Sequence, residues 1–132
     1  MTAKKTAILR KLLLVEDEAM LAEMYTTKFT ADGFEVIVAS DGAKALELAP
    51  KEKPDIILLD VIMPKLDGFA VLRQLKSDPI TKDIPVLLLT NLGQDEDLKK
   101  GKELGAVDYF VKSNHTPADI VAKVKEFIAH AA

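Results

Sequence analysis

The chain has 132 residues, of which 48% are hydrophobic and 30% charged, a composition typical of one globular domain and not of a disordered or fibrous protein. It has no cysteine, which excludes disulfides and thiolate metal sites and is usual in a reducing cytosol. Its 18 basic and 21 acidic residues give a net charge of −3, which argues against nucleic acid as the main ligand. No apolar run approaches the ~20 residues of a membrane-spanning helix. We therefore expect a cytoplasmic domain with no membrane insertion.

Five short apolar runs, separated by longer stretches of helical period, predict five strands. They span residues 11–15, 34–39, 55–60, 85–90 and 107–111. The first, third and fourth runs contain consecutive apolar residues without alternation, which is typical of parallel strands covered by helices on both faces. The second and fifth carry Glu35 and Asp108, so we expect them at the two edges of the sheet.

The stretches between the strands predict helices with recognisable ends. The first should stop at Asp32 and Gly33, the second at Pro50, and the third just before Pro79. The last should begin with Thr116 as its cap. Five strand–helix units in series predict an α/β fold, a flavodoxin-like doubly wound parallel sheet of five strands in the order 2-1-3-4-5 with five helices.

The segment 94–104 is the weakest of the predicted helices. Leu98 and Leu104 are its only apolar anchors, and Gly101 lies inside it. Glycine in a helix interior costs about 1 kcal/mol relative to alanine. We therefore expect a helix here that is held loosely.

Polar residues follow several of the predicted strands, where ligands bind in an open α/β sheet. Glu16 and Asp17 follow the first strand, Asp60 ends the third, Thr90 ends the fourth, and Lys112 follows the fifth. Because the first and third strands should be neighbours, their three carboxylates are expected in one pocket. Oxygen ligands of this kind suit Mg²⁺. An ammonium and a hydroxyl beside a carboxylate nucleophile are typical of a phosphoryl-transfer site.

With these motifs the sequence resembles the receiver domain of two-component response regulators, in particular a stand-alone, chemotaxis-regulator-like receiver. The motifs that carry the resemblance span residues 12–18, 54–60, 63–68, 85–90 and 105–112. Each motif alone is weak evidence, but the five occur in order at predicted strand ends. The resemblance implies that residues 10–130 form the receiver domain and that residues 1–9 are a loose tail.

The resemblance also implies a role for each matching position in the acidic pocket. Asp60 matches the aspartate that accepts the phosphoryl group from a histidine kinase. Glu16 and Asp17 match the acidic pair that holds Mg²⁺ together with Asp60. Ile62 matches the residue whose backbone carbonyl is a further metal ligand.

Three further positions match the residues that respond to phosphorylation. Thr90 matches the switch hydroxyl, Tyr109 the aromatic residue that follows it inward, and Lys112 the lysine that pairs with a phosphoryl oxygen. The implied cofactor is Mg²⁺, and the implied partners are a sensor histidine kinase or histidine phosphotransfer protein and a downstream protein target. The domain would catalyse its own phosphorylation and slow dephosphorylation without being an enzyme in the ordinary sense.

Three departures from the family pattern lie next to these positions. Ser113 follows Lys112 where the family usually has a proline in a cis peptide, and Asn91 replaces a small residue. Ile62 and Leu92 are apolar at positions where such pairs usually hinder the attacking water, so we predict slow self-dephosphorylation.

Other functions are compatible with parts of this pattern. Glu16 and Asp17 are also what the first turn of a helix favours. A haloacid-dehalogenase-type phosphatase would have a second acid where this chain has Ile62, and a flavin carrier would not have an acidic loop after its first strand.

A docking module that is never phosphorylated stays open. Only four residues follow Ile128, which favours a stand-alone receiver, but a fragment of a longer regulator is equally compatible. Phosphorylation-dependent dimerisation also stays open.

Overall fold

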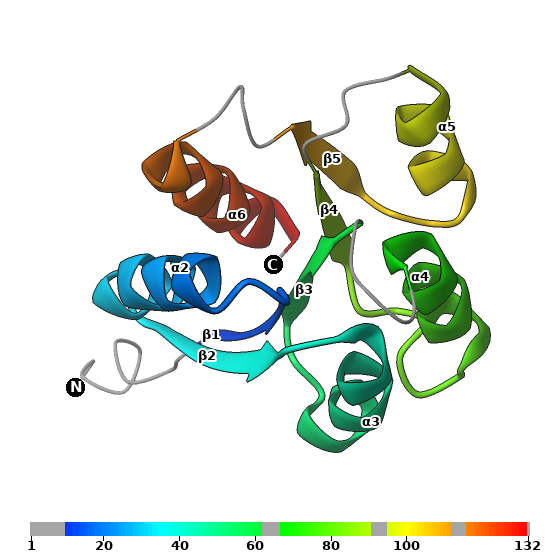
Figure 1. Ribbon diagram of the computed structural model, residues 1–132, viewed down its shortest axis with the longest axis horizontal. Coiled ribbons are helices and arrows are strands. Elements are labelled where there is room, and N and C mark those ends of the chain that lie inside the picture. The colour runs from blue at the N-terminus through cyan, green and yellow to red at the C-terminus, as the bar shows by residue number, and fades with distance from the viewer. Residues whose placement is uncertain (1–9, 62–66, 91–94, 112–115, 132) are drawn as a thin grey trace.

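The computed structural model describes residues 10–61, 67–90, 95–111 and 116–131. Their backbone forms a parallel five-stranded sheet in the order β2-β1-β3-β4-β5, flanked by five helices (Figure 1). The strands are β1 (Arg10–Val15), β2 (Phe34–Ala39), β3 (Ile56–Asp60), β4 (Val86–Thr90) and β5 (Asp108–Val111). The helices are α2 (Ala19–Ala31), α3 (Gly42–Glu52), α4 (Gly68–Ser77), α5 (Asp95–Glu103) and α6 (Pro117–Ala131). The predicted fold class and strand order are confirmed.

The sheet separates two apolar cores, because successive side chains of a strand point to opposite faces. On one face α2 and α6 contribute the residues that pack on the sheet, among them Phe29 and Val124. On the other face α3, α4 and α5 do so, with Ala45, Leu72 and Leu98. The three central strands β1, β3 and β4 are apolar on both sides and almost completely buried. This explains why their sequences show no alternation.

Most of the predicted helix ends are confirmed. Helix α2 ends at Asp32, followed by Gly33 with φ +92°, a value that glycine adopts without strain. Helix α6 begins with a capping box: the Thr116 hydroxyl accepts a hydrogen bond from the Asp119 N–H (3.1 Å), and the Asp119 carboxylate accepts one from the Thr116 N–H (3.0 Å). Within the described residues, none of the helices combines the length and hydropathy that a membrane crossing requires.

The prediction that the second helix stops at Pro50 is wrong. Helix α3 runs through Pro50 to Glu52 and is closed by Lys53, which has φ 47°. The Lys53 N–H donates to the Ala49 carbonyl at 2.9 Å. A proline removes its own backbone hydrogen bond and crowds the carbonyl four residues before it, but only two residues of α3 follow Pro50, and Lys53 then completes the cap.

Gly101 has a packing role in α5 that its sequence context does not reveal. The residue is buried, and a Cβ added to it would come within 2.5 Å of Leu88 Cδ1 and 3.6 Å of Tyr109 Cδ2. The missing side chain therefore lets α5 lie close to β4 and β5. The expected helix is present over Asp95–Glu103, and the glycine that weakens it as an isolated helix also lets it approach the sheet.

Candidate functional site

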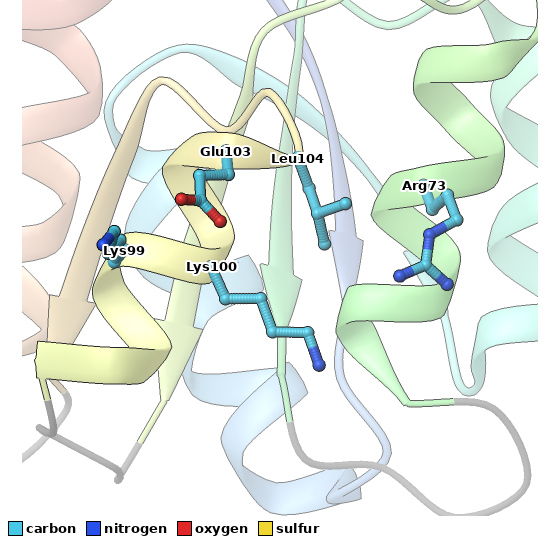
Figure 2. A pocket seen from close by; sticks show the side chains of 5 residues that line it. All are labelled: Arg73, Lys99, Lys100, Glu103 and Leu104. Carbon is cyan, nitrogen blue, oxygen red and sulfur yellow. The ribbon is translucent and has the colours of Figure 1, made fainter.

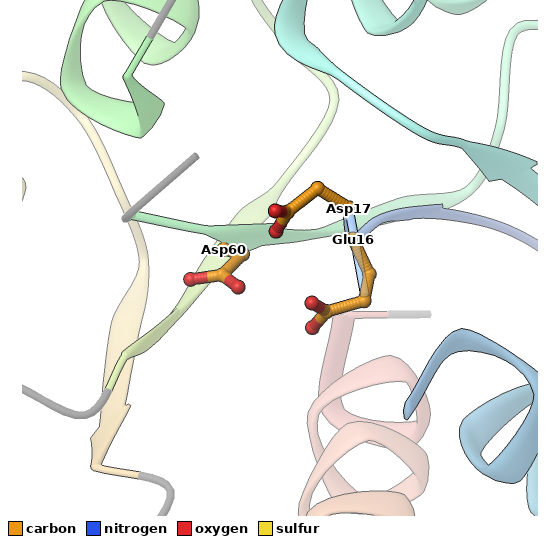
Figure 3. Close-up of side chains that lie close together, drawn as sticks. All are labelled: Glu16, Asp17 and Asp60. Carbon is orange, nitrogen blue, oxygen red and sulfur yellow. The ribbon is translucent and has the colours of Figure 1, made fainter. Parts of the chain in front are cut away.

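Glu16, Asp17 and Asp60 form an acidic cluster at the carboxyl edge of the sheet. Strands β1 and β3 are paired in register up to Val15 and Leu59, so the residues that follow them leave the sheet side by side. One carboxylate oxygen from each of the three residues lies within 4.8 Å of the other two (Figure 3). The predicted meeting of these three side chains is therefore observed.

The cluster places like charges close together in a partly dehydrated setting. Glu16 is 2% and Asp60 5% exposed, whereas Asp17 is exposed to solvent. Two unit charges 4.8 Å apart repel by about 3.5 kcal/mol at an effective dielectric constant of about 20 but by only about 0.9 kcal/mol in bulk water, the limit nearer to the exposed Asp17. A divalent cation with oxygen ligands would replace this repulsion with attraction. The donor set fits Mg²⁺, which binds proteins through one or two carboxylates and keeps several waters.

The alternative that these acids serve to cap α2 is not supported by the local bonds. The residue at the N-cap is Glu18, and its side chain makes no capping bond. Glu16 Oε2 accepts a hydrogen bond from the Glu18 N–H at 3.1 Å, one position before the helix begins. Glu16 therefore shapes the turn that leads into α2, and its carboxylate stays at the edge of the sheet.

The start of α4 lies directly against the backbone of Asp60. Asp67 caps this helix by accepting a hydrogen bond from the Ala70 N–H at 2.9 Å. The Gly68 N–H donates to the Val61 carbonyl at 2.8 Å. A Cβ on Gly68 would lie 2.5 Å from the Asp60 carbonyl oxygen and 2.6 Å from Val61 Cα. Sequence reasoning recognised Asp67 and Gly68 as part of a motif but missed that Gly68 positions Asp60.

Thr90 and Tyr109 lie on the neighbouring strands β4 and β5. Thr90 ends β4 and is completely buried, and Tyr109 is 8% exposed. Tyr109 is paired with Leu88, two residues before Thr90. Because alternate residues share a face, Thr90 and Tyr109 are both on the face covered by α3, α4 and α5. This is the arrangement a switch pair would need.

Several residues singled out in the sequence lie outside the described residues. They are Ile62, Asn91, Leu92, Lys112 and Ser113. The position of the Lys112 ammonium, the Ile62 carbonyl and the peptide after Lys112 therefore remain predictions. Val111, which precedes Lys112, is paired with Thr90, so the chain reaches the same edge of the sheet at that point.

Comparison with known proteins places this chain in a family. The family described as "Response regulator receiver domain" matches residues 12–125. The probable transcriptional regulator ycf27 of Guillardia theta is 41% identical over 115 residues, which is 87% of this chain and 44% of that protein. The response regulator PleD of Caulobacter vibrioides is 46% identical over 102 residues, 77% of this chain and 22% of that protein. This chain thus spans less than half the length of these curated relatives.

Solved structures of similar length agree with this assignment. The chemotaxis protein CheY4 of Vibrio cholerae has a TM-score of 0.84 and 30% identity, covering 90% of this chain and 98% of that one. The receiver domain of the Francisella response regulator 1452 has a TM-score of 0.85 and 30% identity, covering 93% and 99%. With the matched fold and the family model covering most of its length, this chain belongs to the response regulator receiver domain family.

Proposed function

We propose that this domain accepts a phosphoryl group on Asp60 from a histidine kinase or histidine phosphotransfer protein in a Mg²⁺-dependent reaction. The observation that carries the proposal is the acidic cluster, in which Asp60 ends a central strand within 4.8 Å of Glu16 and Asp17. The proposed domain extends over residues 10–130, preceded by a tail at 1–9, and acts in the cytoplasm.

The proposed step is a nucleophilic substitution at phosphorus. An oxygen of the Asp60 carboxylate forms a new P–O bond, and the P–N bond of a phosphohistidine breaks, its electron pair returning to the imidazole nitrogen. The product is a mixed acyl phosphate. Carboxylates form such intermediates in other phosphoryl-transfer proteins. The chain's part is to hold the nucleophile at a fixed edge of the sheet, which the contact between Gly68 and the Asp60 backbone supports.

The residues that would hold Mg²⁺ are Glu16, Asp17 and Asp60, with the backbone carbonyl of Ile62 as a further ligand. The bound cation would neutralise charge on the transferred phosphoryl oxygens. As the resemblance to the receiver family implies, Glu16 would act through a water while Asp17 binds directly. Lys112 would pair with a phosphoryl oxygen.

The response to phosphorylation would pass through Thr90 and Tyr109. A phosphoryl group brings roughly −1.5 to −2 charges and three strong acceptor oxygens. The Thr90 hydroxyl would donate to one of them, and the movement would change the packing of Tyr109 against α5. The close approach of α5 to Tyr109 supports this coupling, because a Cβ added to Gly101 would lie 3.6 Å from Tyr109 Cδ2. The surface of α5 and β5 is then the one that differs between the two states.

The output of this domain would be contact with a downstream protein. The relatives named as transcriptional regulators are longer than this chain, and in our proposal any contact with nucleic acid belongs to parts of such proteins outside the receiver. Apolar Ile62 and Leu92 should slow the attack of water on the acyl phosphate. Phosphorylated protein with Ile62→Asn and Leu92→Glu should then lose its phosphoryl group faster than the parent, and an equal half-life would refute this point.

The chemistry of the bond tests the proposal. The protein is incubated with acetyl phosphate and Mg²⁺, and the added phosphoryl group is then treated with hydroxylamine at neutral pH. An acyl phosphate on Asp60 is released by this nucleophile, whereas a phosphoester on serine or threonine is retained. Rapid release supports the proposal. A stable phosphoester, or no incorporation, would point instead to a receiver-like docking module.

A further inference from the structure

A groove between α4 and α5 has a lining of opposite charge to the protein as a whole. Its volume is about 490 Å³, and it is lined by Arg73, Lys99, Lys100, Glu103 and Leu104. Arg73 extends from α4 into the gap, and Lys100 on α5 and Leu104 just after it extend towards it (Figure 2). The described lining residues thus include three cations and one acid, although the chain carries a net charge of −3.

Two cations of this groove, Arg73 and Lys99, differ from lysines elsewhere on the described surface. On α3, Lys44 and Lys51 both pair with Glu47, at 3.8 and 4.0 Å. Within the described part of the chain, neither Arg73 nor Lys99 forms an ion pair. Among the described residues, no acid competes with an external anionic group for these two charges.

Helix α5 contacts both α4 and the sheet beside the groove. The Lys100 ammonium lies 4.7 Å from the centroid of the Phe69 ring on α4, a cation–π contact that links the two helices. Gly101 brings the backbone of α5 close to Leu88. The cation–π contact thus joins the two helices that form the groove. It lies outside the acidic cluster, and none of the residues proposed for phosphoryl transfer line it.

We propose that this groove binds an acidic segment of a protein partner. Arg73, Lys99, Lys100 and Glu103 are exposed and Leu104 is half-buried, so the groove is open along its length. Small-molecule sites bury most of their ligand, which this lining cannot do. The cations also come from two helices instead of surrounding one point. An extended or helical peptide can place carboxylates against both walls and an apolar side chain on Leu104.

The test measures binding of a short probe peptide that carries glutamates on both sides of one leucine. The full chain, unphosphorylated, is titrated at low salt while backbone amide shifts and affinity are recorded. We expect shifts concentrated on α4 and α5, and no binding of a peptide with glutamine in place of glutamate.

Arg73→Glu and Lys99→Glu should each weaken binding by ~10-fold. The matched control is Lys28→Glu on α2, which makes the same charge change on an exposed lysine and should have an effect within about twofold.

Glu103→Gln should have the opposite effect on binding, because it removes the one acid among the described lining residues. This variant should bind the peptide more tightly, a gain that damage to the fold cannot produce. Equal losses in Arg73→Glu and Lys28→Glu would reduce the effect to general charge attraction and overturn the proposal. So would shifts confined to other surfaces. Pyrophosphate that displaces the peptide at equal concentration would reassign the groove to a small phosphate-bearing anion. Since no phosphorylation is involved, a failure here leaves the proposed function of Asp60 unaffected.

Discussion

Gly68 lies so close to Asp60 that a Cβ atom on it would stand 2.5 Å from the Asp60 carbonyl oxygen. This contact joins the first turn of α4 to the end of β3, where the proposed phosphoacceptor is located. The close approach is possible only for glycine, because the facing atoms belong to the backbone and cannot rotate away. The position of the nucleophile therefore depends on a residue with no chemistry of its own.

Gly68→Ala should disturb Asp60 without touching its carboxylate. We expect a loss of about 1–3 kcal/mol in the free energy of unfolding, because the added methyl group overpacks the site, and slower phosphoryl incorporation. The matched control is Gly101→Ala, whose Cβ meets the rotatable end of Leu88 and which gains helix propensity. It should be closer to the parent in both measurements. Urea unfolding and the rate of labelling by acetyl phosphate check this, and equal effects of the two variants would contradict the positioning role.

Asp17→Asn should have opposite effects on stability with and without Mg²⁺. Without metal, removing one of three clustered charges should stabilise the fold by about 0.5 kcal/mol. With Mg²⁺ at 100 times its dissociation constant, the parent should gain about 2.7 kcal/mol, and the variant at the same concentration should gain far less. Urea unfolding with and without Mg²⁺ measures both. Glu18→Gln, which removes an exposed acid next to the cluster, should respond to Mg²⁺ as the parent does.

Thr90→Ala should separate phosphorylation from its consequence. The variant keeps the acidic cluster, so it should still take up a phosphoryl group, but it lacks the hydroxyl that would respond to the phosphoryl oxygens. We expect hydrogen exchange in α5 and β5 to change on phosphorylation in the parent and to change much less in the variant. Equal changes in both proteins would mean that Thr90 does not carry the signal.

Lys76 predicts a pH dependence of stability. Its ammonium donates to the carbonyls of Lys82 and Ile84, at 3.0 and 2.8 Å. Burial lowers its pKa below the usual 10.5, and Asp83 partly opposes this effect. Between the lowered pKa and 10.5 the unfolded chain binds more protons than the folded chain, so this lysine makes stability rise with pH there. The free energy of unfolding of the parent should therefore rise relative to that of Lys76→Met as the pH increases to 10.5. A constant difference would contradict the lowered pKa.

The strands and the acidic cluster could be predicted because their signals are local. Unbroken apolar runs marked β1, β3 and β4, and in a parallel sheet the strand order brings Glu16 and Asp60 to one edge. The roles of the two packing glycines could not be predicted, since they depend on what lies opposite in the folded chain. Gly68 faces the Asp60 backbone, and Gly101 faces Leu88. The end of α3 was misplaced for a related reason, because Lys53 completes a cap that tolerates the proline before it.

The most direct test of the central claim is the intact mass of the protein after incubation with acetyl phosphate and Mg²⁺. The parent should gain one phosphoryl group. Asp60→Asn should gain none, and neither should the parent in the presence of a chelator. Asp41→Asn is the matched control, because it makes the same change at the cap of α3, where asparagine caps as well as aspartate, and it should be labelled like the parent. Labelling of Asp60→Asn at the parent's rate, or no labelling of the parent, would contradict the assignment of Asp60 as the phosphoacceptor.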